Sequence, residues 1–277
     1  MQEEYGTLEP LWYTGQCPII DNDLTILAPA GDEVLMTAID CATGEAAWET
    51  PNSHGWDMSH SSVIPMTFHG TRMFVYCAIG GAVGVAADGP EAGRLLWEVP
   101  WDANVIAPSP VPLDGDRILF TAGYGNGSMM VRLHFEDGEF APEVLFRREP
   151  RDWLTSEQQT PIYYDGLLHG IMPKDAGGLR GQFVCYDPDG GLVWSSGPAN
   201  RFGLGPFILA DGKFYILSDD GVLTILEQDR EQYIPLDEAR IMDGHDAWGP
   251  IAIAGTRMLL RDSTLMVCIE MDAIGQE

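Results

Sequence analysis

The sequence predicts an all-β fold, a β-propeller built from four-stranded antiparallel blades. Three observations indicate it. A short sequence element recurs six times along the 277 residues, at spacings of 44 to 51 residues. Each copy is followed by a turn and a β-rich apolar run, and no amphipathic helix pattern interrupts the series. Glycine and proline number 32 and 19, which suits short strands and many turns.

The first element is a small residue, usually followed by proline and then by apolar residues. Its proline position falls at residues 18, 62, 110, 161, 206 and 250. The copies are Cys17-Pro18-Ile19-Ile20, Ser61-Ser62-Val63-Ile64, Ser109-Pro110-Val111, Thr160-Pro161-Ile162, Gly205-Pro206-Phe207 and Gly249-Pro250-Ile251. Six copies in order predict one equivalent strand at the start of each repeat.

Two further elements complete each repeat. A turn followed by a β-rich run comes next, as in Asp211-Gly212 before FYILS, and such turns are typical of hairpins. A strand, a polar turn and a returning strand that ends in tryptophan follow, most clearly from Ala38 to Trp48. Weaker copies end at Trp97 and Trp194, while the third, fifth and sixth repeats keep the strand and lack the tryptophan. Each repeat therefore holds about four short strands.

Four antiparallel strands per repeat form one propeller blade, because a lone four-stranded sheet cannot bury both faces and packs on its neighbours. We expect a single propeller domain over residues 1–277. Its repeats cover approximately residues 13–50, 57–100, 105–148, 156–197, 201–236 and 245–272. A two-sheet sandwich that repeats by chance is the alternative.

The charge balance excludes some functions. Asp and Glu number 42 against 15 Lys and Arg, so the formal net charge is −27 and the pI is about 4.2. Such a polyanion repels phosphate backbones and anionic membrane surfaces, so we expect no nucleic-acid partner. A hydrophobic content of 45% excludes intrinsic disorder. A negative surface also keeps a protein soluble, so we draw no further functional conclusion from the acidity.

The sequence shows no export signal, no membrane span and no disulfide framework. The first residues, MQEEYGTLEPLWYTG, lack the basic and apolar regions of a signal peptide. The most apolar stretch, Met73 to Ala87, is too short for a membrane helix and is split by Gly80-Gly81, which favours two strands. The five cysteines include no adjacent pair and no CxxC, and most lie in apolar runs. We expect them to be buried free thiols.

Residues Ile39 to Trp48, with Asp40, Thr43-Gly44 and the final tryptophan, resemble the tryptophan-docking repeat of pyrroloquinoline-quinone (PQQ)-like propellers. That family includes quinoprotein alcohol dehydrogenases and the propeller lipoprotein that helps to assemble outer-membrane proteins. The resemblance covers essentially the whole chain, and residues 113–133 and 201–227 look like uncharacterised bacterial PQQ-like repeat proteins. It implies that Thr-Gly forms a tight turn and that Trp48, Trp97 and Trp194 are structural.

The chain departs from that family in blade number. Family propellers commonly have seven or eight blades, whereas six repeats are present here, and the sixth ends at Met271-Asp272 without a fourth strand. Either residues Glu3 to Trp12 supply this strand and close a six-bladed ring, or the chain is part of a larger ring and lacks two N-terminal blades and a signal peptide. We favour closure, because it protects sheet edges. An open ring would need a partner that caps its blade edges.

The resemblance also raises the question of a cofactor. Quinoprotein dehydrogenases hold PQQ with Ca²⁺, a base aspartate and often a disulfide between adjacent cysteines. None of these positions can be matched in this sequence. We therefore expect no cofactor and no metal, with PQQ and Ca²⁺ as the alternative.

Other motifs are better explained as turns. Asp187-x-Asp189-Gly190 begins like a calcium loop but has Pro198 where the loop needs glutamate, so it predicts a hairpin turn. The glycine-rich segment 123–128 has no following Lys-Ser/Thr, and Asn126-Gly127 predicts a type I′ turn. His54 and His60 lack partners at metal-ligand spacing.

One set of residues is placed together by the repeat. Residues just before each small-proline position should begin the innermost strands, which meet around the central channel. This ring contains tryptophan, tyrosine, histidine, amide and charged side chains, including Tyr13, Asn104 and Glu157. The candidate ligand-binding residues are Trp12, Gln16, Trp56, His60, Gln158, Gln159, Arg201, His245, Asp246 and Trp248. Aromatic rings that stack and amides that orient suit a neutral polar ligand, such as a sugar or peptide. Alternatively, these side chains only plug the channel.

These observations favour a non-catalytic binding or scaffold propeller, whose channel mouth meets a small polar ligand, a glycan, a peptide or a protein. One alternative is a PQQ- and calcium-dependent dehydrogenase. Another is a carbohydrate-active enzyme that uses His245, Asp246 or Glu157 for proton transfer. The resemblance implies a periplasmic or extracytoplasmic location, and a cytoplasmic one stays open.

Overall fold

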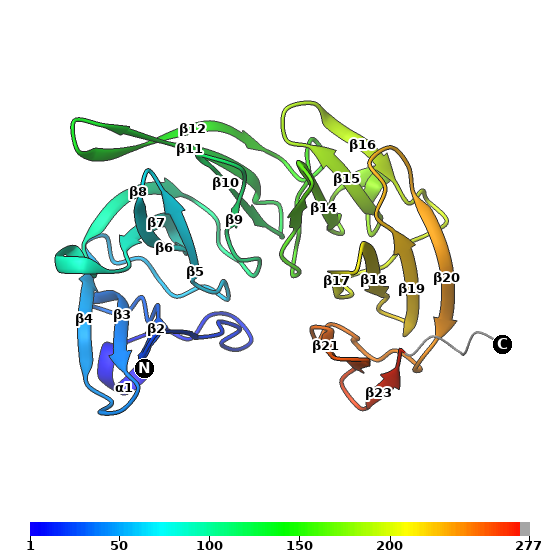
Figure 1. The fold of residues 1–277 in the computed structure, drawn as a ribbon, viewed down its shortest axis with the longest axis horizontal. Coiled ribbons are helices and arrows are strands. Elements are labelled where there is room, and N and C mark those ends of the chain that lie inside the picture. Colours follow the sequence, from blue (N-terminus) through cyan, green and yellow to red (C-terminus); the bar gives the residue numbers. More distant parts are fainter. Residues whose placement is uncertain (272–277) are drawn as a thin grey trace.

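The computed structural model describes residues 1–271, which form six antiparallel sheets around a central space (Figure 1). Five sheets have four strands and the sixth has three, each ordered along the sheet as along the chain. This confirms the predicted all-β propeller of six repeats. We number the sheets as blades 1 to 6. Figure 1 shows the first strands β17 and β21 toward the central space and the last strands β4, β12 and β20 outside.

The first three blades follow a short helix, α1 (Gln2–Tyr5). Blade 1 contains β1 (Ile19–Asp21), β2 (Leu24–Leu27), β3 (Val34–Asp40) and β4 (Ala46–Pro51). Blade 2 contains β5 (Ile64–Phe68), β6 (Thr71–Ala78), β7 (Gly80–Ala86) and β8 (Leu95–Trp101), with the 3-10 turn η1 (Gly89–Glu91). Blade 3 contains β9 (Val111–Pro112), β10 (Arg117–Ala122), β11 (Gly127–Glu136) and β12 (Glu139–Arg148).

The last three blades continue the series to residue 271. Blade 4 contains β13 (Ile162–Tyr164), β14 (Leu167–Ile171), β15 (Phe183–Asp187) and β16 (Gly191–Ser195), with η2 (Gly177–Leu179). Blade 5 contains β17 (Phe207–Ala210), β18 (Lys213–Leu217), β19 (Val222–Glu227) and β20 (Ile234–Arg240). Blade 6 contains β21 (Ala252–Ala254), β22 (Arg257–Arg261) and β23 (Met266–Glu270). The fifth sheet extends past residue 236, and residue 272 of the sixth repeat lies outside the described residues.

Hydroxyl residues of the first element, at its small position in Ser109 and Thr160 and at its proline position in Ser62, link consecutive blades. The Cys17 backbone N–H donates to the Ser62 hydroxyl at 2.9 Å, the Ser62 N–H to the Ser109 hydroxyl at 3.2 Å, and the Ser109 N–H to the Thr160 hydroxyl at 2.9 Å. A hydroxyl here therefore satisfies a donor of the preceding blade that the sheets leave unpaired. The series ends where the fifth and sixth copies have Gly205 and Gly249.

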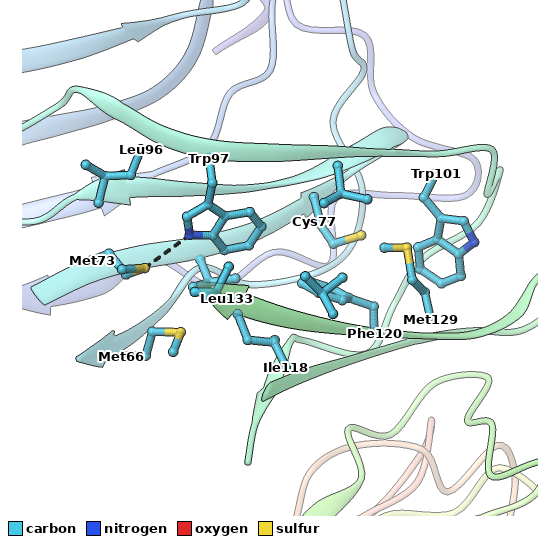
Figure 2. Packing of buried hydrophobic residues seen from close by; sticks show 14 of the residues in the cluster. Met66, Met73, Cys77, Leu96, Trp97, Trp101, Ile118, Phe120, Met129 and Leu133 are labelled. Atoms are coloured by element: carbon cyan, nitrogen blue, oxygen red, sulfur yellow. Dashed lines mark hydrogen bonds between the residues drawn. The ribbon is translucent and has the colours of Figure 1, made fainter. Parts of the chain in front are cut away.

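The tryptophans of the third element pack between blades, as predicted. Trp97 is 3% exposed and lies in the cluster between blades 2 and 3, where its indole N–H contacts Met73 Sδ at 3.2 Å (Figure 2). Trp194 is buried between blades 4 and 5, and half-buried Trp48 stacks on Phe74 of blade 2. The Asp of this element caps its turn: Asp40 accepts backbone N–H groups from residues 42 and 43, and Asp187 from residues 189 and 190. The predicted hairpin at Asp187 is therefore confirmed.

Five hydrophobic clusters join blades 1 to 2, 2 to 3, 3 to 4, 4 to 5 and 5 to 6. Among residues 1–271, none joins blade 6 to blade 1. The expectation that residues Glu3 to Trp12 close the ring as a fourth strand is wrong. Residues 2–5 form α1, and residues 6–18 run without regular strand structure.

Two local expectations are also corrected. The left-handed residues of the loop after β10 are Tyr124 and Gly125, with φ of 58° and 83°, and the Asn126 N–H donates to the Gly123 carbonyl. The primed turn therefore centres on Tyr124-Gly125 and not on Asn126-Gly127. All five cysteines are free, but only Cys77 and Cys185 are buried, because the other three lie at strand ends or on faces that no blade covers.

Candidate functional site

A cavity of about 640 Å³ lies where the inner loops of the blades converge. It collects side chains from the N-terminal segment and from blades 2, 3, 4 and 6. The lining residues are Trp12, Tyr13, Thr14, Gly15, His60, Val105, Ala107, Tyr124, Glu157, Gln158, Gln159, Asp246, Trp248, Gly249, Pro250, Arg261, Asp262 and Ser263. A cavity of this size accommodates a small organic molecule or a short oligomer.

Residues 11–13 carry two aromatic rings to the cavity. The Trp12 ring lies 5.5 Å from that of Tyr124 and 6.2 Å from that of His60, between ring centres, and Tyr13 lies 5.8 Å from His60. Burial lowers the pKa of His60, an effect partly offset by the backbone carbonyls of Leu11 and Tyr13 near its ring. His60 is therefore neutral at neutral pH and positions this segment without adding charge.

Three lining residues have a left-handed backbone that non-glycine residues rarely adopt. The φ angles of Trp12, Tyr124 and Asp246 are 77°, 58° and 54°. For a bulky residue this conformation costs energy, so the surrounding structure has to hold it in place. Strained residues of this kind concentrate at ligand sites, where they preorganise side chains.

The wall of the cavity at blade 4 includes Glu157, a buried carboxylate that pairs with the half-exposed Lys174. The Glu157 side chain is 1% exposed and accepts from Lys174 Nζ at 3.0 Å, and this bond raises the pKa of Lys174. Lys174 Nζ also lies 4.1 Å from the centre of the Tyr124 ring, a cation–π contact. Burial and then the charge of Glu157 raise the pKa of Tyr124, which remains a hydroxyl donor at neutral pH.

Blade 6 supplies the opposite wall. The Gln159 amide donates to the Trp248 carbonyl at 3.1 Å and so connects blade 4 to blade 6. The Trp248 indole N–H donates to Asp219 Oδ1, also at 3.1 Å. Asp262 accepts backbone N–H groups of residues 245, 264 and 265, which hold its pKa well below its usual range. The Asp262 carboxylate therefore stabilises the loop that follows β22 through these hydrogen bonds.

The structure brings six of the ten candidate residues to this cavity: Trp12, His60, Gln158, Gln159, Asp246 and Trp248. The other four lie elsewhere. Gln16 donates to and accepts from the backbone of Ala28, Trp56 stacks on His54 at 4.9 Å, Arg201 donates to the Pro198 carbonyl, and His245 pairs through its backbone with Ser263.

Sequence reasoning missed Tyr124 and Arg261. Tyr124 sits in the glycine-rich turn, and its signal was the glycine on each side of it. Arg261 ends β22, outside the segment before the small-proline position. Its side chain passes over Gly249, where a Cβ atom would lie 2.4 Å from Nε, so this glycine makes room for the guanidinium.

The lining does not match the donor set for PQQ with calcium. PQQ carries carboxylates that need cations, and Arg261 faces Glu157, Asp246 and Asp262 in the same cavity. Among residues 1–271 no group of three or more His, Cys, Asp or Glu side chains is placed to hold a metal ion. The residues present therefore do not fit this cofactor.

Comparisons with known proteins agree with the fold. Residues 7–131 match the family model described as "Outer membrane protein assembly factor BamB". The structure is similar to BamB from Moraxella catarrhalis at 12% identity and a TM-score of 0.58, covering 91% of this chain and 70% of that one. No curated protein matches in sequence. With the repeats, these findings show that the chain is a β-propeller and that residues 7–131 are similar to PQQ-like repeat proteins.

Two further structures share the fold. Quinohemoprotein alcohol dehydrogenase from Comamonas testosteroni has a TM-score of 0.54 at 12% identity; the alignment covers 88% of this chain and 51% of the enzyme, about half its length. AztD from Citrobacter koseri has a TM-score of 0.54 at 10% identity, covering 92% of this chain and 68% of that one. At these identities the similarity shows the fold alone. No helix within residues 1–271 has the length and apolar character needed to cross a membrane.

Proposed function

We propose that this chain is a non-catalytic binding propeller whose central cavity takes a short, uncharged glycan. The observation that carries the proposal is the convergence of Trp12, Tyr13, Tyr124 and Trp248 on one cavity. Sugar rings have apolar faces that stack on aromatic side chains, while their hydroxyls need hydrogen-bond partners at the edge.

Amides and hydroxyls are available for those bonds. The Gln158 side chain has no hydrogen-bond partner among residues 1–271, and the Gln159 amide uses its N–H₂ on Trp248 while its oxygen stays unused. Tyr124 contributes a protonated hydroxyl. A glycan would thus exchange its hydration for bonds to side chains that the fold already orients.

The charges of the cavity favour a neutral ligand. Three carboxylates and one cation, Arg261, line it, and Lys174 outside the lining is paired with Glu157. An anionic ligand would meet only one unpaired guanidinium, that of Arg261, among three carboxylates. Electrostatic repulsion would therefore oppose the binding of polyanions.

The carboxylates also support a binding role over hydrolysis. Glycoside hydrolysis uses two carboxyl groups on either side of the bond. Glu157 is held by Lys174, and Asp262 by the backbone of its loop. This leaves Asp246 as the carboxylate without a side-chain partner in the described cavity lining. The site lacks a second uncommitted carboxylate to act with it.

The remaining parts of the proposal follow from the same site and from the family model. We propose that no cofactor is required. The family matched by residues 7–131 is that of an outer-membrane protein assembly factor, which supports an extracytoplasmic location and protein partners for this chain.

A glycan array probed with the purified protein tests the proposal. We expect binding to neutral oligosaccharides, weakened at least about tenfold in Trp12→Ala and in Gln159→Ala, which remove a stacking ring and an amide. Arg201→Ala is the matched control, because this arginine lies outside the lining. Absence of binding to every neutral glycan, or equal losses in the control variant, would contradict the proposal.

A further inference from the structure

Within residues 1–271, the outer edge of blade 6 is its third strand, whereas the outer edge of every other blade is a fourth strand. In blades 1 to 5 a fourth strand covers the third, whereas β23 is the last strand of its sheet within residues 1–271. The open face of this sheet carries exposed apolar side chains: Leu259 is 37% exposed and Met266 is 68% exposed. The opposite face, with Met258 and Leu260, is buried against blade 5.

The edge of β23 is not protected against pairing. Proteins blunt exposed edge strands with proline, lysine or bulges. Four of the five outer strands contain proline, at positions 51, 100, 142 and 235. The register shifts of the complete blades lie between their third and fourth strands, a pairing that blade 6 lacks within residues 1–271. The sequence of β23, MVCIE, has neither proline nor lysine.

The internal repeat shows what belongs beside this edge. In blades 1, 2 and 4 a small residue of the third strand pairs with the docking tryptophan of the fourth: Ala38 with Trp48, Gly84 with Trp97 and Cys185 with Trp194. In blade 4 the row continues inward from Cys185 to His169 and Ile162. In blade 6 the equivalent row is Cys268, Leu259 and Ala252. Cys268 is exposed, so the place beside it, which the docking tryptophan occupies in the other three blades, is open.

We infer that β23 accepts an extended segment of a partner protein as the fourth strand of its sheet, with an aromatic side chain opposite Cys268. Backbone hydrogen bonds along Met266–Glu270 would supply affinity, and the aromatic side chain on Leu259 and Cys268 would supply selectivity. Strand addition to an exposed edge is a common mode of peptide recognition.

The aromatic side chains of the N-terminal segment are engaged elsewhere. Trp12 and Tyr13, the aromatic side chains nearest the N-terminus after Tyr5, are held at the cavity by His60 and Tyr124. Residues 272–277, Asp-Ala-Ile-Gly-Gln-Glu, contain no aromatic residue. The inference is independent of the proposed glycan site.

Fluorescence anisotropy with a labelled synthetic peptide of residues 189–196, which contains Trp194, tests it. We expect saturable binding to the full chain, weakened at least about tenfold when the peptide tryptophan is replaced by alanine. The protein variant Cys268→Arg should lose binding, because its long charged side chain fills the position, whereas Cys268→Ala should keep it. In a Cys17→Ser, Cys41→Ser background, bound peptide should also slow the reaction of Cys268 with a thiol reagent.

Several results would overturn the inference. These are absence of saturable binding, equal binding of the tryptophan-free peptide, or unchanged binding to Cys268→Arg. Binding that appears only after removal of residues 272–277 would assign the edge to the chain's own tail. A concentration-dependent dimer that excludes the peptide would assign it to a second copy.

Discussion

Lys174 Nζ lies 3.0 Å from Glu157 Oε1 and 4.1 Å from the centre of the Tyr124 ring, so one cation joins a buried carboxylate of blade 4 to an aromatic side chain of blade 3. Glu157 and Tyr124 line the cavity between the blades. Because the Glu157 side chain is 1% exposed, its charge depends on this partner.

Replacement of Lys174 by methionine should therefore destabilise the protein. Removing one member of a buried ion pair leaves an uncompensated charge, and because Lys174 is half exposed we expect a loss of about 2 kcal/mol in the free energy of unfolding. Urea denaturation measures it. The double variant Lys174→Met, Glu157→Gln should recover most of the loss. Equal stability of the single variant and the native protein would show that Lys174 does not stabilise the Glu157 carboxylate.

Trp97→Ala should be among the most destabilising single changes. The side chain is 3% exposed between blades 2 and 3, and truncating a buried tryptophan typically costs about 3–5 kcal/mol (Figure 2). Trp12→Ala is the matched control, because Trp12 is 58% exposed and should affect ligand binding with little change in thermal stability. A reversed order of the two melting temperatures would contradict the assignment of Trp97 to the core and Trp12 to the site.

His169 should make the fold sensitive to acid. The residue is fully buried among Phe183, Trp194 and Phe214, neither ring nitrogen has a partner, and burial lowers its pKa from 6.5 to about 4. Between these values the unfolded chain binds a proton that the folded chain refuses. The free energy of unfolding should thus be unaffected by this group above pH 6.5 and should fall by roughly 3 kcal/mol as the pH decreases to 4.

Urea denaturation at a series of pH values separates this effect from other titrations. His169→Leu should flatten the stability profile between pH 6.5 and 4, whereas His134→Gln, at an exposed histidine of blade 3, should not. An unchanged slope in His169→Leu would refute the assignment.

Thiol titration should find two classes of cysteine. Cys17, Cys41 and Cys268 are exposed and should react rapidly in the native protein. Cys185 and Cys77 are buried, and burial raises the pKa of both thiols, to about 12 for Cys185, so they should react only on unfolding. Five rapid thiols would indicate that the interblade clusters are loosely packed.

Much of the fold could be predicted because the same strand and turn elements recur in six repeats. The small-proline element marks each first strand, and Trp97 and Trp194 lie in the interblade clusters that their shared motif indicates. The ring ends could not be predicted from that pattern. Whether residues 3–12 form a strand depends on tertiary contacts, and here Trp12 and Tyr13 pack at the cavity rather than beside β23.

The candidate site was predicted in the same partial way. Equivalent positions before the first strands place Trp12, His60, Gln159 and Trp248 together, since the propeller converts sequence register into proximity. Gln16 shares that register, yet its amide pairs with the Ala28 backbone. The strand register determines where a residue lies. The direction of its side chain also depends on local hydrogen bonds, which a single sequence does not reveal.

Isothermal titration calorimetry of the purified chain tests the central claim most directly, with neutral oligosaccharides in one series and PQQ with and without Ca²⁺ in another. The account predicts one glycan site per chain, weakened at least about tenfold by Trp12→Ala and unchanged by Arg201→Ala, and no heat from PQQ. Calcium-dependent binding of one PQQ per chain, with no heat from any glycan, would contradict it and assign the cavity to a quinone cofactor.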